Sequence, residues 1–184
     1  MILMKDIIRE GHPTLRKVAE EVTLPLSDED KKIAESLMEY VLNSQDDDLA
    51  EKYNLRPGIG LAAPQINVSK RMFAIYIEGE DEPELDIIAI NPKIVSHSVE
   101  QTFLDSGEGC LSVDRPVEGY VPRYARITIE AYNIEGKKIK KRLRGLPAIA
   151  FQHELDHLNG VMFFDHIDES NPFKANEFAQ PLES

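Results

Sequence analysis

Residues Phe151 to Gly160 read FQHELDHLNG, with two histidines four positions apart and a glutamate directly after the first. Side chains four residues apart lie on the same face of a helix, so His153 and His157 can hold one metal ion between them. Glu154 is turned by about 100° from His153 around the helix and can reach a water on that ion as a general base. The pattern therefore predicts a helix with a metal site, in preference to a pair of core histidines.

The residues around this stretch predict the limits of the helix and the class of the fold. Pro147 suits a first helical turn, and Gly160 suits the position after the last turn, so we expect the helix to run to about Asn159. Other expected elements are helices at 27–44 and 47–53, strands at 72–77, 85–90 and 93–99, and a hairpin from 126 to 144. Strands in the middle and helices at both ends favour an α+β fold over a doubly wound one.

Composition indicates an ordinary globular protein. Of the 184 residues, 42% are hydrophobic and 29% are charged, and no apolar run approaches the length of a membrane helix. The start of the chain does not resemble a secretory signal or a transit peptide. We expect residues 1–184 to form a single catalytic domain in the cytoplasm, away from the membrane, with a loosely held polar C-terminal tail from about residue 169.

The formal net charge of −12 argues against general binding to nucleic acids and against specific DNA binding. Lys137 to Arg144 read KKIKKRLR and are the local exception, with six cations in eight residues. The simpler interpretation of this segment is a solvated strand face. The alternative is a patch that contacts phosphate groups, and this alternative stays open.

The type of the third metal ligand determines the class of the site. Phe163 occupies the position where metzincin peptidases have a third histidine, and it cannot coordinate a metal. His166 lies close after the helix stop, where a surface role is the stronger interpretation. Glu177 would give a metallopeptidase, but it lies in a short polar tail. Cys110 lies in the glycine-flanked stretch SGEGCLSVD, unlike a structural cysteine among apolar neighbours.

We therefore favour Cys110 as the third ligand and keep Glu177 as the alternative. Three protein ligands with one open position are typical of a catalytic metal site. A soft thiolate suits iron or zinc better than magnesium. A metal-stabilised binding module without catalysis is a further alternative, and it would not need Glu154.

Arg56 to Ile66 read RPGIGLAAPQI, which is neither a helical nor an ordinary strand pattern. The segment indicates a loop whose backbone approaches another group closely. It lacks the features of a phosphate-binding loop. Gln65 near its end offers a side-chain amide, which is a neutral hydrogen-bond donor.

Three segments, GIGLAAPQ, EGCLS and HELDH, occur in this order and together resemble the peptide deformylase family without a departure. The stretches GHPTLR and NPKIV are also similar to the family, so the resemblance covers most of the chain. The segments before RPGIG and around EGEDEPE resemble its longer, Gram-positive-like bacterial type. The resemblance implies an α+β fold with antiparallel sheets packed around the metal-binding helix.

The resemblance also implies an activity, namely metal-dependent removal of the N-formyl group from the N-terminal formyl-methionine of newly synthesised polypeptides, with release of formate. It implies one divalent metal ion, Fe(II) first, with zinc, nickel or cobalt as alternatives. Glu154 would move protons, and Gln65 with the backbone N–H of Leu111 would bind the developing oxyanion. The partners expected are formylmethionyl peptides and nascent chains, with a transient ribosome contact through KKIKKRLR, and a monomer is the default.

Small and apolar residues near the three segments are the predicted substrate site. Gly60 and Gly109 would leave room for the formyl group and the peptide backbone. Four apolar residues would line the site or its methionine slot: Ile59, Leu146, Ile149 and Ala150. The alternative interpretation is that Leu146, Ile149 and Ala150 are plain core residues.

Two acidic residues are predicted to position the metal ligands without binding the metal. Glu108 would hold the loop around Cys110, here called the cysteine loop, by pairing with an arginine. Asp156, on the helix of the two histidines, would have a similar supporting role. The sequence does not distinguish among four candidate partners of Glu108: Arg56, Arg115, Arg123 and Arg126.

Overall fold

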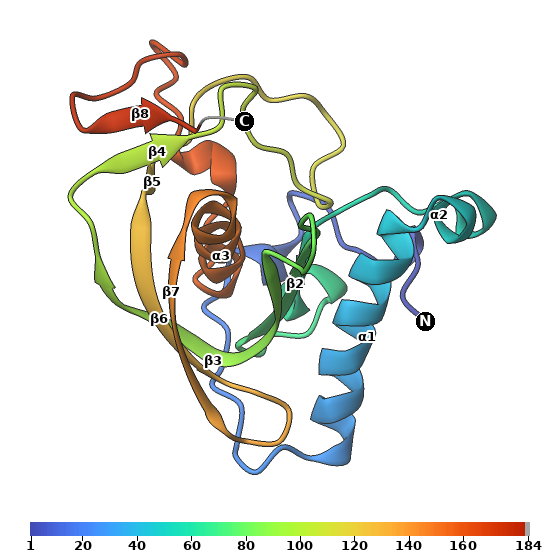
Figure 1. Ribbon diagram of the computed structural model, residues 1–184. Helices are drawn as coiled ribbons and strands as arrows, with labels where there is room; N and C mark the ends of the chain where they lie inside the picture. Colours follow the sequence, from blue (N-terminus) through green and yellow to red (C-terminus); the bar gives the residue numbers. More distant parts are fainter. Residues whose placement is uncertain (183–184) are drawn as a thin grey trace.

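The computed structural model describes residues 1–182 of this chain. In that range the α-helices are α1 Asp28–Gln45, α2 Asp47–Tyr53 and α3 Gly145–Leu158. The strands are β1 Gly60–Ala62, β2 Met72–Ile77, β3 Leu85–His97, β4 Gln101–Phe103, β5 Arg123–Tyr124, β6 Arg126–Tyr132, β7 Lys138–Arg144 and β8 Ala179–Pro181. Figure 1 shows α3 near the centre, with β3, β6 and β7 curving past it on one side and α1 on the other.

The strands form two sheets. A five-stranded sheet has the order β1-β2-β3-β6-β7 with antiparallel neighbours, and a three-stranded sheet has the order β5-β4-β8. The predicted hairpin is β6 and β7, and its alternating residues Ile127, Ile129 and Ala131 are buried. The predicted α+β fold with antiparallel sheets around the metal-binding helix is confirmed, with the parallel pair β4–β8 as an exception.

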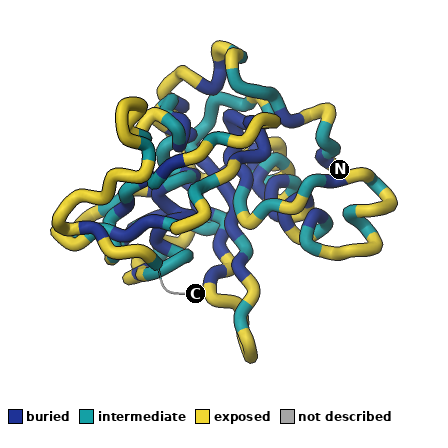
Figure 2. Tube along the Cα trace, turned by 90° about the horizontal axis from the view of Figure 1, so that it is seen from above, coloured by how far each residue is buried: buried dark blue, intermediate teal, exposed yellow. Residues whose placement is uncertain are grey.

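Strand β2 is buried on both faces, because α1 and α3 pack on opposite sides of it. Met72 and Ala74 of β2 belong to the core that includes α1, whereas Phe73 and Ile75 belong to the core that includes α3. This alternation follows the two-residue period of a strand. The ring of Phe73 meets that of Phe151 in α3 edge to face, with centroids 5.1 Å apart. Figure 2 shows the buried stretches gathered in the middle of the molecule.

Helix α1 forms where the sequence predicts it. The side chain of Ser27 accepts a hydrogen bond from the N–H of Asp30, and acidic residues fill the first turn. Leu37 and Val41 on its apolar stripe are fully buried. Within residues 1–182, no helix combines the length and the apolar character that a bilayer crossing requires.

Two expectations about the strands are wrong. The predicted strands at 85–90 and 93–99 are one strand, β3, whose pairing with β6 shifts register between Ile90 and Lys93 and again between Ile94 and Ser96. Such bulges absorb extra residues without ending a strand. The stretch RPGIGLAAPQI is only partly a loop, because Gly60–Ala62 pairs with β2 as β1.

The expectation of a loosely held C-terminal tail is wrong for its last described residues. Ala179 is buried in β8, which pairs in parallel with β4. The N–H of Gln101 donates to the carbonyl of Phe178 at 2.8 Å, and the N–H of Leu182 donates to the carbonyl of Phe103 at 2.9 Å. Strand β4 would otherwise leave these backbone groups unpaired at a sheet edge.

Candidate metal centre and active site

Helix α3 carries the HELDH segment and ends as predicted. Its C-terminal turn is followed by Gly160, which has a φ of +73°. A Cβ on Gly160 would lie 2.6 Å from the carbonyl oxygen of Arg16, so this position requires glycine for space as well as for conformation. The close crossing of the N-terminal segment therefore fixes the end of α3.

The structure brings together the three residues that the sequence predicts as metal ligands. One donor atom from each of Cys110, His153 and His157 lies within 4.8 Å of the other two. The Cys110 sulfur is 3.4 Å from Nε2 of His157. Cys110 and His157 are buried, and the side chain of His153 is 12% exposed. Two imidazoles and a thiol converge here on one point.

This donor set fits a divalent transition metal. Nitrogen and sulfur donors of this kind are preferred by zinc and iron, and three protein donors leave a further position open. Two buried polar atoms at the site, Oε1 of Glu154 and Nδ1 of His157, have no hydrogen-bond partner among the described residues. A buried carboxylate oxygen without a partner is unfavourable, so Glu154 is arranged for a water or a substrate.

Glu108 orients the first histidine. Its Oε1 lies 2.9 Å from Nδ1 of His153, and this hydrogen bond leaves Nε2 of His153 available to a metal. Arg123 donates to both carboxylate oxygens of Glu108 at 3.0 and 2.9 Å. Burial alone would raise the pKa of Glu108, but the hydrogen bonds from His153 and Arg123 outweigh it and lower the pKa to about 2. Glu108 is therefore an anion.

Arg123 is the arginine that pairs with Glu108, which the sequence left open. It also donates to Asp156 at 2.6 Å, and Nε2 of His166 lies 2.8 Å from the same carboxylate. Arg123 and Glu108 have side chains only 3% and 4% exposed. One buried guanidinium thus joins β5, the cysteine loop and α3.

Gln65 lies in a fixed orientation beside the cysteine. Its side-chain N–H groups point to Oγ of Ser112 at 3.1 Å and to the Cys110 sulfur at 3.5 Å, and its Oε1 accepts from the N–H of Ala62 at 2.9 Å. Gln65 is 1% exposed and Ser112 is fully buried. Sequence reasoning missed Ser112, although it ends the EGCLS segment.

Arg56 has a different role from the one considered for it. Its guanidinium donates to the backbone carbonyls of Cys110 and Val113, the latter at 3.0 Å, and lies 3.4 Å from Asp114. These contacts tie the start of the GIGLAAPQ segment to the cysteine loop. Asp114 is also held by Arg9 at 3.0 Å. The N-terminal segment thereby helps to position the thiol.

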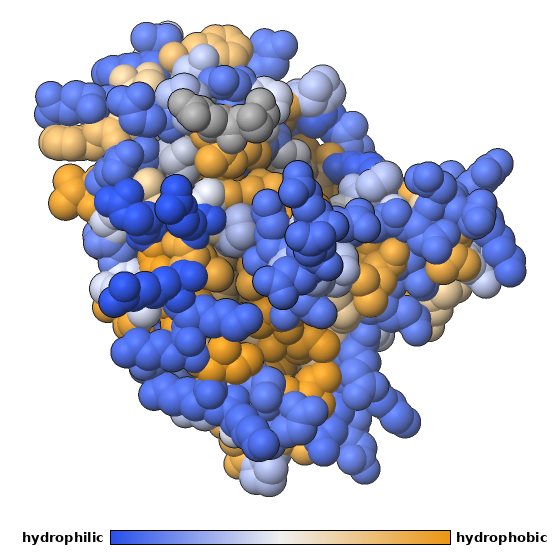
Figure 3. All heavy atoms as spheres, viewed as in Figure 1, coloured by the Kyte–Doolittle hydropathy of each residue, from blue (hydrophilic) through white to orange (hydrophobic). Residues whose placement is uncertain are grey.

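A cleft of about 430 Å³ opens onto the three donors. A Cβ on Gly60 would lie 2.8 Å from Oε2 of Glu154, whereas one on Gly109 would meet no atom within 4 Å. Each residue predicted to bind substrate lines this cleft: Ile59, Gly60, Gly109, Leu146, Ile149 and Ala150. Figure 3 shows apolar residues gathered in the middle of one face of the molecule, with hydrophilic residues around them.

The alternative ligands lie elsewhere. Glu177 is exposed near β8 and does not belong to the donor cluster. Phe163 belongs to a neighbouring core cluster, and its ring is roughly parallel to that of His153 with centroids 6.1 Å apart.

The surrounding residues shift the pKa of the Cys110 thiol and of the Glu154 carboxyl group. Burial would raise the pKa of the Cys110 thiol, but His157 and His153 outweigh it and hold that pKa well below its usual value. This favours the thiolate, which is the form that binds metals. Burial raises the pKa of Glu154 above that of an ordinary glutamate. A raised pKa suits a carboxylate that accepts and returns protons near neutral pH.

The two histidines and the glutamate of α3, next to a cysteine and a fixed amide, have the arrangement that is typical of hydrolases of the HExxH type. The family model for polypeptide deformylase matches residues 4–173. The chain is 61% identical to peptide deformylase 2 of Bacillus anthracis over the whole of both chains, and 62% identical to peptide deformylase 2 of Geobacillus stearothermophilus over 99% of each.

Solved structures give the same result. The peptide deformylase of Thermotoga maritima is 34% identical with a TM-score of 0.69, over 88% of this chain and 96% of that one. An actinonin-bound class I type b peptide deformylase of Acinetobacter baumannii is 26% identical with a TM-score of 0.70, over 91% and 99%. This chain belongs to the peptide deformylase family, and the resemblance seen in its three segments is confirmed.

Proposed function

We propose that this chain hydrolyses the N-formyl group from the N-terminal formyl-methionine of newly synthesised polypeptides and releases formate. The observation that carries the proposal is the convergence of Cys110, His153 and His157 beside Glu154, at the inner end of a cleft. The match to deformylases over nearly the whole chain supports the same activity.

The roles of the residues follow from their positions. When bound, a divalent metal supplies Lewis-acid chemistry and lowers the pKa of a water. The unpartnered oxygen of Glu154 accepts the proton of the attacking water and then passes it to the leaving nitrogen. The side-chain N–H of Gln65 and the backbone N–H of Leu111 stabilise the oxyanion, and one such donor is typically worth about 3–4 kcal/mol.

The cleft suits a short peptide with an apolar first residue. Ile149 and Ala150 are 2% and 4% exposed, and Leu146 is half-buried beside them. These side chains offer an apolar slot for methionine next to Glu154. Gly60 gives space at the carboxylate, where the small formyl group would lie.

The metal that we propose is Fe(II), with zinc, nickel or cobalt as substitutes, because a thiolate and two imidazoles suit each of these ions. We also propose that residues 1–184 act as a single catalytic domain, as a monomer in the cytoplasm. The nascent chain is the expected partner, and contact with the ribosome is proposed as transient.

The test is anaerobic purification with metal analysis, followed by measurement of formate released from a formyl-Met peptide. We expect about one metal ion per chain and release of formate, with no reaction on the same peptide carrying an acetyl group. A metal-loaded, folded preparation that releases no formate would overturn the proposed activity.

A further inference from the structure

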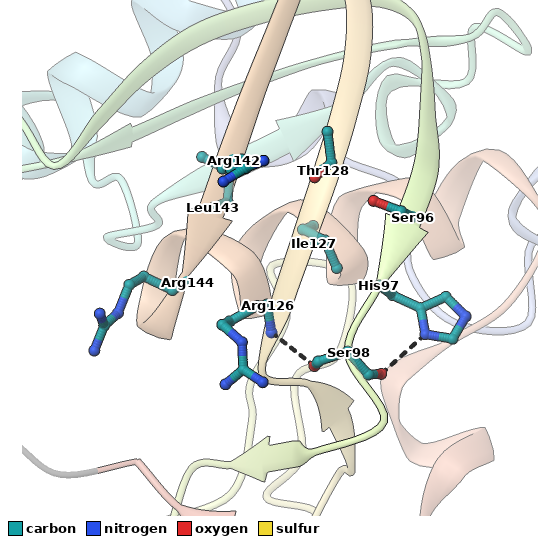
Figure 4. Close-up of a pocket in the computed structure, with 9 residues that line it drawn as sticks. All are labelled: Ser96, His97, Ser98, Arg126, Ile127, Thr128, Arg142, Leu143 and Arg144. Atoms are coloured by element: carbon teal, nitrogen blue, oxygen red, sulfur yellow. Dashed lines mark hydrogen bonds between the residues drawn. The ribbon is translucent and has the colours of Figure 1, made fainter.

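A second pocket, of about 390 Å³, lies on the five-stranded sheet and shares no residue with the active-site cleft. The strand register places its polar side chains in two rows across β3, β6 and β7 (Figure 4). One row is Ser96, Thr128 and Arg142, and the next is Ser98, Arg126 and Arg144. Hydroxyl groups and guanidinium groups thus surround one hollow.

Some of these groups are already paired. Arg126 lies 2.8 Å from Glu100, and Oγ of Ser98 accepts from the backbone N–H of Arg126. Within residues 1–182, by contrast, Arg142 and Arg144 have no carboxylate partner. In the same range, the hydroxyl groups of Ser96 and Thr128 make no hydrogen bond. Two cations and two hydroxyl groups remain for a ligand.

Two arginines occupy opposed positions beside the pocket, and Glu100 offsets the charge of only one of them. Arg126 lies directly opposite Arg144, and like charges at opposed positions destabilise a sheet. Charged residues on an exposed edge strand do protect it from pairing with other chains, which accounts for the lysines of β7. Edge protection does not account for a hollow lined by arginine and hydroxyl side chains.

The cations continue along the strand beyond the pocket. Lys138 and Lys140 lie on the same face of β7 as Arg142 and Arg144, because every second residue of a strand points to the same side. Successive positive residues in this row are about 6.8 Å apart. The acidic residue opposite Lys140 on β6, Glu130, lies 3.2 Å from Lys138 and 3.6 Å from Lys93. A line of regularly spaced cations matches an extended chain of anions better than a single small anion.

We propose that this face of β3, β6 and β7 binds the phosphodiester backbone of an RNA strand, with one phosphate group in the pocket. Binding to an anionic membrane is not favoured, because the apolar lining residues Ile127 and Leu143 are buried and cannot insert. RNA is favoured over DNA because the hydroxyl groups of Ser96 and Thr128 can pair with a ribose 2′-hydroxyl.

The choice of RNA also rests on the proposed function, because nascent chains are made on RNA-containing particles. The net charge of −12 makes the rest of the surface repel RNA, so binding must be local and sensitive to salt. RNA binding and formate release can be measured separately, so either can fail without the other.

The test uses the metal-loaded full chain and a fluorescent single-stranded RNA, with anisotropy measured from low to physiological salt. Arg142→Gln/Arg144→Gln should weaken binding at least about 5-fold at low salt and reduce the log–log salt slope by about 0.7, the contribution of the one phosphate group in the pocket on a single strand. Thr128→Val keeps the shape of the strand and should weaken RNA binding by about 2-fold, the loss expected for one hydroxyl hydrogen bond.

The matched control is Lys32→Gln/Lys52→Gln, which changes the net charge equally at exposed sites on α1 and α2. It should bind RNA like the parent chain, and all variants should keep the parent rate of formate release. Equal RNA affinity of the parent and the arginine variant would overturn the proposal. So would equal binding of DNA of the same sequence, or binding only to phosphatidylserine vesicles.

Discussion

At the scale of single residues, each side chain in the site is held by several contacts. Cys110 has its carbonyl bound by Arg56 and its sulfur near Gln65 and His157. Glu154 differs, because one of its oxygens has no partner among the described residues and it faces the glycine at position 60. A rigid donor set next to a carboxylate with a free oxygen is suited to catalysis rather than to holding a structural metal.

Glu154→Gln is expected to lower the rate of formate release by about 10²- to 10⁴-fold, since the variant cannot accept a proton. Metal content should be unchanged, because the carboxylate is not among the three converging donors. Metal analysis and steady-state kinetics on the same preparation test this. Turnover at the parent rate would point instead to a binding module that does not need the base.

Cys110→Ser is expected to lose most of the bound metal, because an alcohol is a far weaker ligand than a thiolate. Glu177→Ala should retain the metal, since Glu177 is exposed and lies outside the cluster. Dialysis against a graded chelator measures both. The opposite pattern would support a metallopeptidase-type ligand set.

At the scale of elements, α3 is joined to β5 and to the cysteine loop by buried charges. Arg123 contacts Glu108 and Asp156, and Glu108 contacts His153 in turn. Just past the same C-terminal end, Arg16 donates to the carbonyl of Gly160 and to the side chain of Asp165. These contacts hold the half of α3 that carries His153 and His157 in place relative to Cys110.

Arg123→Met is expected to destabilise the fold by about 3–5 kcal/mol, because it leaves two carboxylates without their buried partner. Metal affinity should fall by about 10- to 100-fold as the orientation of His153 is lost. Urea unfolding and metal competition measure the two effects. Arg115→Met, at a half-exposed pair with Glu10, is the control and should cost less than about 1 kcal/mol.

The contact of Arg16 with Asp165 makes a small part of the stability depend on pH. The hydrogen bond from Arg16 at 2.5 Å lowers the pKa of Asp165 below its ordinary value. Its contribution is therefore complete above the unfolded pKa of about 3.9 and is lost as pH falls through the folded pKa.

Asp165→Asn should be less stable than the parent by less than about 1 kcal/mol at pH 7, since both partners are partly exposed. The difference between the two chains should shrink below about pH 4, where the parent carboxylate is protonated. Urea unfolding at pH 7 and pH 3 tests this, and a difference that grows at low pH would contradict the assigned pairing.

At the scale of the whole molecule, the two long helices pack on opposite sides of β2 and have different roles. Helix α1 covers one face of β2, and α3, which carries the two histidines, packs on the other face. The second sheet, closed by β8, supports the cysteine loop from the side of β5.

Removing residues 176–184 should lower the free energy of unfolding by about 1–3 kcal/mol, since two or more backbone hydrogen bonds between β8 and β4 are lost. Formate release per folded molecule should persist, because β8 lies outside the cleft. A chain ended after Leu182 keeps the β8 contacts and is the control. Equal stability of both truncated chains would show that β8 contributes little.

The sequence by itself determined the local features of this protein. A four-residue spacing places His153 and His157 on one face, a serine caps α1, and alternation gives the β6–β7 hairpin. These patterns can be recognised in the sequence because they follow the period of the helix or of the strand. The glycine-flanked context of Cys110, unlike that of a structural cysteine, made it the favoured third donor.

Only the tertiary structure decided which distant groups meet. It brought Cys110 to His157 across 47 positions, selected Arg123 from four arginines, and gave the C-terminal tail a place as β8. No sequence period encodes such contacts, because they depend on how the whole chain buries its apolar surface and pairs its charges. The pocket on β3, β6 and β7 arises in the same way, from the register of three strands that the sequence alone does not set.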